Sequence, residues 1–441
     1  MNQIRLLVCL STSLCCLVSQ ASDDVPLLPA TASDPVSVTA LPSRLLSPFS
    51  LELKGQGMAN WQRYDSAISS GRLSARLFGQ GDIGGPFGLE LNTRLRTQGN
   101  SREEYRAEKN IRLDIQSLAF NYSPTSEWRW VAGRTNIRNG VASGFNPTDW
   151  FKDNSQVVFD SLDTADRRED RLGVVALMGI WLNEESVLSF GYRPDLHVRP
   201  ETVAGHSDVV GLGLDRTNNK DAVFIKYTPS PAAWNNMALT VNSLYQKDQP
   251  GVGAELSFTV RDNLVLYSEW FSQRRQSLID ETIESAGDRM RYYHQLASGF
   301  SWSLPESLVA REDISFSVEY HINQAGINQS QLGLWRQAIA DGDRPAAKVG
   351  LLAGEKQEPL AKQQYFGRLA WNDFWQDNDL SLITTVTPMD GSGFSQLTFS
   401  APVMPALRVD LQGYHYFGNA NTIYGSSGRE KGFMISLVYT I

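Results

Sequence analysis

Basic side chains recur through this sequence at positions where a strand would turn them to one side. A guanidinium group presents a rigid fork of N–H donors that fits carboxylates and phosphates, so a column of arginines facing water would attract anions. Carboxylates alternate with these cations, and mutual pairing would instead leave a wet, nearly neutral surface. Both interpretations stand. The candidate lining residues are Lys54, Arg72, Arg76, Glu90, Arg94, Arg96, Arg112, Asp114, Arg129, Arg134, Arg138, Glu255, Glu319, Arg368, Arg408 and Asp410, and Glu269 shares their side.

Catalytic chemistry has no comparable basis here. The five histidines include no pair with metal-ligand spacing. His294 and Ser298 share one strand face, but they are too far apart for a nucleophile and its base. The sequence also has no glycine-rich phosphate loop and no dinucleotide fingerprint. We therefore expect no enzyme, no metal and no cofactor.

The elements that would position the charged column are long amphipathic strands. In "KGFMISLVYTI", Phe433, Ile435 and Leu437 fall on one face, while Met434 and Ser436 fall on the other. This two-residue period marks a strand, because successive side chains point to opposite faces. It recurs in about eighteen segments between residue 49 and the C-terminus, most of them long enough for the ~9–11 residues that a tilted strand needs to cross a bilayer.

The connections between these segments alternate in length. Joins such as "DIGG", "NE", "DN" and "QDND" are short, whereas 99–108, 139–170, 194–219, 274–289, 325–362 and 418–430 are longer. Short turns at one end and long loops at the other are typical of outer-membrane barrels. A strand protein can span lipid only as a closed barrel, because every backbone polar group must be paired. The predicted fold is all-β: a transmembrane antiparallel β-barrel of about 18 strands with short periplasmic turns and long extracellular loops.

The N-terminal residues predict an exported protein. Residues 1–21 combine Arg5, an apolar run and small residues before a cleavage site, as in a signal peptide. All three cysteines lie within it. Residues 22–48 are rich in proline and predict a flexible periplasmic lead-in, so the barrel would occupy 49–441. The net charge of −8 argues against a nucleic-acid partner, and the expected location is the cell outer membrane, in contact with its lipid.

The segment "VAGRTNIRNGVASGFNPTDWF" (131–151) predicts a strand over 127–138 that carries Arg134 and Arg138 and continues into the loop 139–170. Loops of this length are usually functional or disordered. We expect it to fold inward and narrow the barrel, although an outward cap is the alternative. Val174 and Ala176 of the next strand are expected to face inside.

This segment also resembles known proteins. Over 133–151 it is similar to the "G-R…G…N-P-x-D" strand-to-loop region of single-chain outer-membrane porins and of the alginate-export barrel family. The resemblance implies a passive channel whose third extracellular loop lies in or near the lumen. The constriction residues that it implies are Phe145, Asn146, Pro147, Asp149 and Trp150.

The loop 325–362 holds a second feature. Leu332, Trp335 and Ile339 have helical spacing and Gly342 is a suitable stop. A lid packed on the barrel mouth is the preferred interpretation, and a pore plug or a docking site for a protein partner are alternatives.

The predicted function is an outer-membrane channel for passive diffusion of small hydrophilic, anionic solutes. One alternative is an export pore for an acidic polysaccharide that works with periplasmic partners. Another is a non-conducting barrel for docking or adhesion through a surface partner. The sequence is compatible with a monomer or a loose trimer.

Overall fold

The computed structural model describes residues 49–62, 65–157, 163–196, 210–211, 213–230, 234, 236–282, 290–305, 313–342 and 344–441. The chain divides into two units, Met1–Ala30 and Thr31–Ile441, and every described residue belongs to the second. The predicted signal peptide 1–21 and lead-in 22–48 lie outside the described residues. Within the described ranges, no helix has the length and apolar character needed to cross a membrane.

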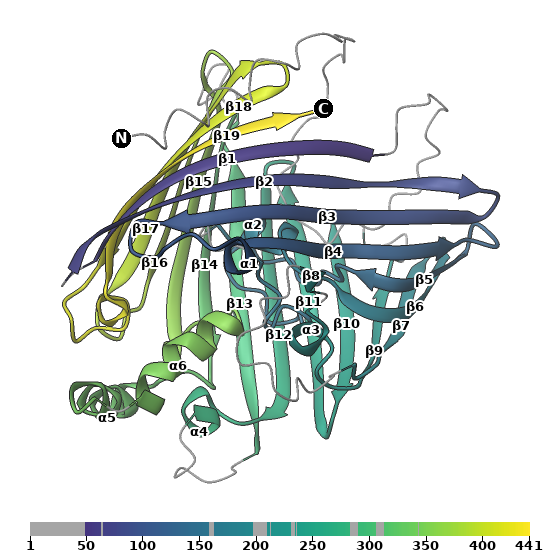
Figure 1. Cartoon of the computed structure of the whole chain (residues 1–441). Helices are drawn as coiled ribbons and strands as arrows, with labels where there is room; N and C mark the ends of the chain where they lie inside the picture. The colour runs from purple at the N-terminus through teal and green to yellow at the C-terminus, as the bar shows by residue number, and fades with distance from the viewer. Residues whose placement is uncertain are drawn as a thin grey trace. The chain divides into compact units, whose positions relative to one another are not determined.

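The described strands form one sheet of nineteen members that closes on itself. Neighbours around the ring are antiparallel, and the first strand, β1 (Phe49–Gln62), pairs with the last, β19 (Arg429–Thr440). Figure 1 shows these two strands side by side, purple against yellow. Only β8 (Val210–Gly211) stands outside this pattern, because it pairs in parallel with β4 (Ile111–Tyr122). The other eighteen strands make the closed antiparallel barrel, which confirms the predicted fold class.

The remaining elements follow in chain order. The other ring strands are β2 (Asp65–Gly84), β3 (Phe87–Asn100), β5 (Trp128–Thr135), β6 (Val174–Asn183), β7 (Ser186–Arg193), β9 (Ala222–Pro229), β10 (Met237–Gln246), β11 (Gln249–Arg261), β12 (Leu264–Arg275), β13 (Arg291–Ser303), β14 (Asp313–Asn323), β15 (Gln363–Trp375), β16 (Asn378–Val386), β17 (Gly393–Met404) and β18 (Leu407–Phe417). The helices are α1 (Ala107–Asn110), α2 (Thr164–Glu169), α3 (Leu214–Thr217), α4 (Leu278–Thr282), α5 (Gln329–Ala340), α6 (Arg344–Glu355) and the 3-10 helix η3 (Gly425–Ser427).

The two faces of the wall differ as the alternation predicts. On β19, Phe433, Ile435 and Leu437 are exposed, whereas Met434 and Ser436 are buried. The exposed residues face outward, where hydrocarbon would surround an outer-membrane barrel. The buried residues face the lumen, so the ring encloses a polar interior.

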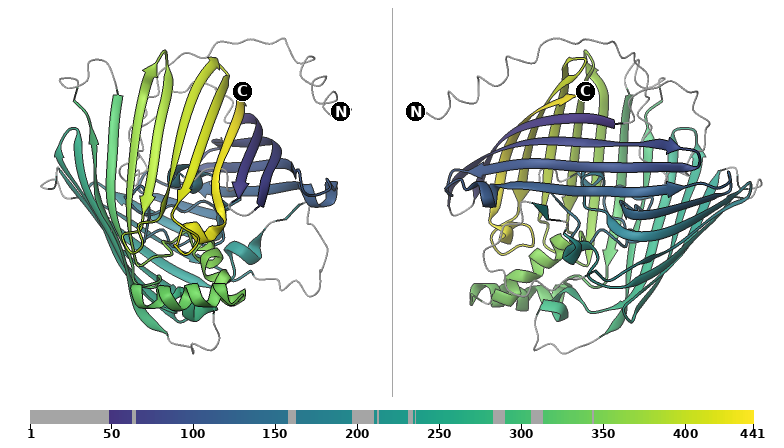
Figure 2. Two further views of the ribbon diagram at one scale, coloured as in Figure 1. Left: turned by 90° about the vertical axis from the view of Figure 1, so that its left-hand side faces the viewer. Right: turned by 45° about the vertical axis from the view of Figure 1, so that its right-hand side comes forward.

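Most short turns lie at one end of the barrel and most long loops lie at the other. Two-residue turns join β2 to β3, β6 to β7, β11 to β12, β15 to β16 and β17 to β18. The helices α4, α5 and α6 gather at the other end, away from the C-terminus (Figure 1), and both views of Figure 2 show the green pair α5 and α6 there. We call this the loop end, which corresponds to the extracellular side of an outer-membrane barrel.

The loop between β14 and β15 forms a helical lid. Leu332 and Trp335 of α5 are buried in one apolar cluster with Val349 and Ala353 of α6 and Leu278 of α4. The lid was the preferred prediction, and its first helix lies where the spacing predicts. The second helix, α6, was not predicted, because Gly342 was read as the end of the helical segment. The chain restarts a helix two residues later with Pro345 in its first turn, where proline is tolerated.

Candidate pore and constriction

A column of basic side chains occupies the lumen face of β1 to β4. Arg76 of β2 is directly opposite Arg94 of β3, and Arg96 is directly opposite Arg112 of β4. Directly opposite residues share a face of the sheet, and this face also carries the buried Asp114. The predicted lining residues on this face are Lys54, Arg72, Arg76, Glu90, Arg94, Arg96, Arg112, Asp114 and Arg129, with Arg408 and Asp410 on β18.

Some of these cations are paired with acids. Arg96 Nε lies 2.7 Å from Asp114 Oδ2, and Arg408 Nε lies 2.9 Å from Asp410 Oδ1. Such pairs neutralise charge locally, which is the neutral interpretation that the sequence left open.

Arg72 and Arg76 are held differently. Arg76 Nε donates to the amide oxygen of Asn92 at 2.9 Å. Arg72 donates to the amide oxygens of Gln56 and Gln98 at 3.3 and 3.2 Å. A neutral amide orients a guanidinium group without cancelling its charge. Glu52 is directly opposite Arg76 on the same face. The lumen face of β1 to β4 nevertheless carries more cations than acids, with Lys54, Arg72, Arg76, Arg94, Arg96 and Arg112 against Glu52, Glu90 and Asp114.

The loop between β5 and β6 lies inside the barrel. Strand β5 ends at Thr135 and the next ring strand begins at Val174. Most described residues between them are buried, and they bond to lumen-facing side chains of the opposite wall. We call residues 136–173 the inner loop. The inward placement agrees with the expected one, but β5 (Trp128–Thr135) is four residues shorter than the predicted 127–138 and ends three residues earlier.

Glu269 of β12 is the first wall anchor of the inner loop. Its carboxylate is fully buried. Oε1 accepts the backbone N–H of Ala142 at 2.5 Å and the Asn146 side-chain amide at 2.9 Å. Oε2 accepts the Thr148 hydroxyl at 3.0 Å. One wall carboxylate thus satisfies several donors of a turn that has no strand partner of its own.

Glu319 of β14 is the second wall anchor. It accepts the backbone N–H groups of Ser143 and Gly144 at 2.6 and 2.9 Å. The Tyr267 hydroxyl donates to it at 2.7 Å, and His321 Nε2 lies 2.6 Å away. Because all these groups are buried or partly buried, each hydrogen bond is stronger than it would be in water.

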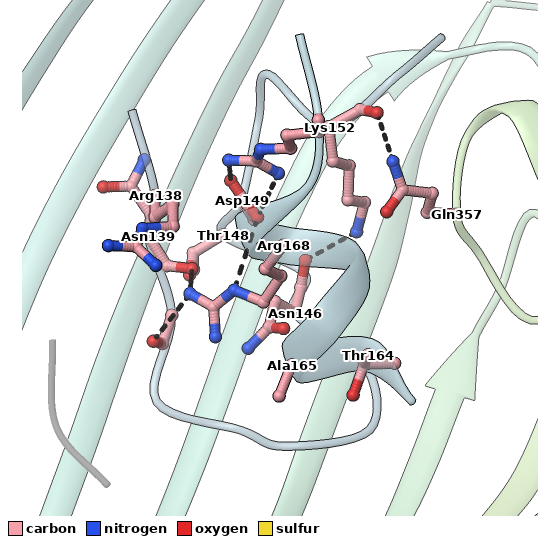
Figure 3. Close-up of polar contacts among 12 residues, drawn as sticks. Arg138, Asn139, Asn146, Thr148, Asp149, Lys152, Thr164, Ala165, Arg168 and Gln357 are labelled. Carbon is pink, nitrogen blue, oxygen red and sulfur yellow. Dashed lines mark hydrogen bonds and ion pairs between the residues drawn. The ribbon is translucent and has the colours of Figure 1, made fainter. Parts of the chain in front are cut away.

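Asp149 organises the inner loop from within. Arg171 Nη1 and Nη2 contact its two carboxylate oxygens at 2.7 and 3.0 Å, and Arg168 Nε lies 3.8 Å away. Burial opposes ionisation, but the two guanidinium groups hold the pKa of Asp149 below its usual value. Figure 3 shows Arg168 reaching from α2 toward Asp149, with Lys152 turned to the Asn146 carbonyl, which accepts from Nζ at 2.6 Å.

An aromatic wedge completes the packing. Trp150 and Phe151 of the inner loop lie in one buried cluster with Val174, Ala176 and Phe224 of the wall. Phe151 and Phe224 meet edge to face, with ring centroids 5.5 Å apart. Val174 and Ala176 do face inward as predicted, and their small side chains make room for the two aromatic rings.

Helix α2 lies across the lumen. Asp163 caps it by accepting the Ala165 N–H at 2.9 Å and reaches Arg368 of β15 at 3.4 Å. At the other end, Asp170 forms an ion pair with Arg94 of β3. The helix is therefore tied to two separated parts of the wall. The arc of β16 to β19, β1 and β2 faces it across the remaining space.

Two predicted lining residues do not lie on the lumen face of a strand. Arg134 is opposite Leu118, which is 42% exposed on the outward face. Its guanidinium donates to the Gly173 carbonyl at 3.0 Å and to Thr217 at 3.1 Å. The segment that contains α3 therefore covers it. Arg138 lies beyond the end of β5, where its contact is Glu169 of α2 at 3.9 Å.

Other predicted residues are inside but enclosed. Glu255 is buried against Asn242 at 3.1 Å and Lys226 at 3.5 Å, and Glu319 holds the inner loop, so neither borders open space. The predicted constriction residues Phe145, Asn146, Pro147, Asp149 and Trp150 are likewise buried. Among the described residues of the inner loop, the exposed ones are Arg138, which was predicted to line the passage, and Asp166 and Glu169 on α2. An aspartate before "TADRRE" is a helix-cap signal that could have located this helix.

Comparison with known proteins bears on the fold. No family model and no curated protein matches this chain. Solved structures do match. OpdQ of Pseudomonas aeruginosa aligns at TM-score 0.51 and 11% identity, covering 89% of this chain and 98% of OpdQ. A BenF-like porin from Pseudomonas fluorescens aligns at TM-score 0.51 and 9% identity, with coverages of 89% and 98%. The fold is therefore that of single-chain outer-membrane porins, as the resemblance implied.

Proposed function

We propose that this chain is a passive outer-membrane channel for small hydrophilic solutes with a preference for anions. The observation that carries the proposal is the excess of cations over acids on the lumen face of β1 to β4, which includes Arg72 and Arg76. Lys54 and Arg112 extend this positive surface along the same face. Fixed positive charge along a water-filled passage raises the local concentration of anions.

The inner loop supplies the constriction. It fills the side of the lumen next to β12 and β14, so a solute would pass between α2 and the arginine-bearing wall. Asp166 and Glu169 of α2 are exposed, and the lumen face of β1 to β4 carries an excess of basic residues. Opposite charges on the two sides of the passage create an electric field across it. Such a field orients a solute that has a charged group at one end and a neutral part at the other. Small organic acids and acidic sugars fit this description.

Planar-bilayer recording tests the proposal. Under a KCl gradient, the purified protein should give a steady open current whose reversal potential has the sign of anion preference. The preference should weaken at 1 M salt, where the Debye length falls to about 3 Å. Cation preference would contradict the proposal.

The same recording separates the two alternatives. An export pore closed by its inner loop would conduct only after the anchors Glu269 and Glu319 are removed. A barrel that serves only for docking or adhesion would be silent in both forms. Liposome swelling with an organic acid and a neutral solute of equal size would then test the solute class.

A further inference from the structure

The outward face of the barrel carries a groove near its loop end. The groove has a volume of about 470 Å³. It lies over β16 to β19 and β1. Its lining residues are Trp61, Leu382, Ser395, Leu397, Gly413, Tyr414, His415, Lys431 and Gly432.

One row of side chains marks the loop end of this groove. Trp61 of β1 is directly opposite Lys431 of β19, and Lys431 is directly opposite His415 of β18. The row faces outward, because Phe433, two residues farther along β19, is 46% exposed on the outward face. An aromatic ring, an ammonium group and an imidazole therefore stand side by side where a membrane interface would lie.

The polar groups of this row are available to a ligand. Lys431 is exposed and has no hydrogen bond or ion pair within the part of the chain that the structure describes. His415 Nδ1 lies 3.2 Å from the Glu430 carbonyl oxygen, which makes Nδ1 the donor and turns Nε2 away. Glu430 precedes Lys431 on β19, so its side chain points to the lumen side of the wall. No carboxylate lines the groove.

Below the row the groove is apolar. Leu397 of β17 is directly opposite both Leu382 of β16 and Gly413 of β18. A side chain at Gly413 would meet open space, with no heavy atom within 4 Å of its Cβ. Gly413 is two residues before His415 on β18, and it therefore lies about 7 Å closer to the bilayer centre. The groove thus has a cationic end at the membrane interface and an apolar trough that leads toward the bilayer centre.

We propose that this groove binds a phosphate-bearing, acylated lipid of the outer leaflet, of the lipid A type. Its phosphate would lie against Lys431 and His415 beside the Trp61 ring, and one acyl chain would follow Leu397 and Leu382 over Gly413. Charge complementarity identifies this occupant, since an unpaired cation at an interface attracts anionic headgroups. A second copy of the chain would bring another Lys431 or an apolar face and would leave the ammonium group unpaired.

Native mass spectrometry of the detergent-solubilised full chain tests the proposal. The probes are bisphosphorylated lipid A, the same lipid without its phosphates, and phosphatidylethanolamine. Wild type should retain bisphosphorylated lipid A preferentially, and Lys431→Gln combined with His415→Gln should weaken it about tenfold. Gly413→Phe, which fills the trough without changing charge, should weaken all acylated probes. Lys247→Gln, in the exposed β10–β11 turn at the same end, is the matched control and should change nothing.

Channel conductance keeps these variants interpretable. None of the altered residues lies in the proposed passage, so each variant should conduct as wild type does if it is folded. Equal retention of all three probes by wild type, or no loss in the double variant, would overturn the proposal. A wild-type oligomer that Gly413→Phe dissociates, with no lipid preference, would instead identify the face as an interface between copies.

Discussion

Glu269 Oε1 lies 2.5 Å from the backbone nitrogen of Ala142, and this hydrogen bond ties the wall strand β12 to a loop residue 127 positions earlier in the chain. Glu319 accepts the corresponding hydrogen bond from the backbone N–H of Ser143, the next residue of the loop. The constriction is therefore held by the far wall in addition to its packing on Val174 and Ala176 of β6, the strand that follows it. Its position depends on two carboxylates whose partners within the inner loop are mostly backbone N–H groups.

Replacing both anchors should release the inner loop. Glu269→Ala with Glu319→Ala leaves at least four buried donors without acceptors, and each such loss costs about 1–3 kcal/mol. We expect larger and noisier single-channel currents and faster proteolysis of the inner loop. Asp410→Ala, which removes a lumen carboxylate that does not contact the loop, is the control. Unchanged conductance in the double variant would show that other contacts position the loop.

Acid should weaken the lid through Glu358. Burial alone would raise the pKa of Glu358, but the Arg275 guanidinium, whose Nη2 is 3.0 Å from Oε2, lowers it to about 2. Because the pKa of Glu358 is lower in the folded protein than in the unfolded chain, ionised Glu358 stabilises the fold at pH values above its unfolded pKa, near 4.5. That stabilisation is lost as the pH falls toward 2. The decrease in the free energy of unfolding is about 3 kcal/mol.

Urea unfolding in detergent micelles between pH 2 and 6, followed by tryptophan fluorescence, measures this loss. Glu358→Gln should be less stable at pH 6 and should lose less stability on acidification. Glu355→Gln changes an exposed carboxylate of the same loop and should retain the wild-type slope. An identical acid response in wild type and Glu358→Gln would assign the effect to other groups.

The ring of strands was predictable because one physical rule acts on every strand. Side chains such as Phe433 and Ser436 alternate because hydrocarbon lies on one side and water on the other, and that pattern is local in sequence. The placement of Arg134 was not predictable in this way. Its burial depends on Thr217, which is 83 residues away in the sequence.

The inner loop shows the same limit. Its length and its aromatic residues predicted an inward fold, but not which residues would border the passage. Trp150 looked like a constriction residue, yet it fills the space beside Val174 and Ala176. Asp166 and Glu169 were overlooked because α2 is too short to show a helical period, and only its aspartate cap marks it.

Two glycine substitutions should have opposite effects on stability. A Cβ at Gly144 would lie 2.4 Å from the Phe366 ring, so Gly144→Ala should displace the inner loop and cost about 1–3 kcal/mol. A Cβ at Gly333 in α5 meets nothing within 4 Å, and Gly333→Ala should stabilise by roughly 0.5–1 kcal/mol. Urea unfolding measures both. If Gly144→Ala left the free energy of unfolding unchanged, the loop would have to rearrange freely around Phe366.

Selectivity should follow Arg72 and Arg76. Two unit charges roughly 8 Å from a solute in water contribute about 1 kcal/mol together. Arg72→Gln with Arg76→Gln should therefore reduce the anion-to-cation permeability ratio roughly thirtyfold at low salt, because the charges that favour an anion by about 1 kcal/mol disfavour a cation by the same amount. The reversal potential under a KCl gradient measures the ratio. Arg274→Gln removes a charge from the outward face, opposite the exposed Tyr292, and should leave the ratio unchanged. If the lumen variant kept its wild-type reversal potential while Arg274→Gln altered it, selectivity would arise at the barrel surface and not along this wall.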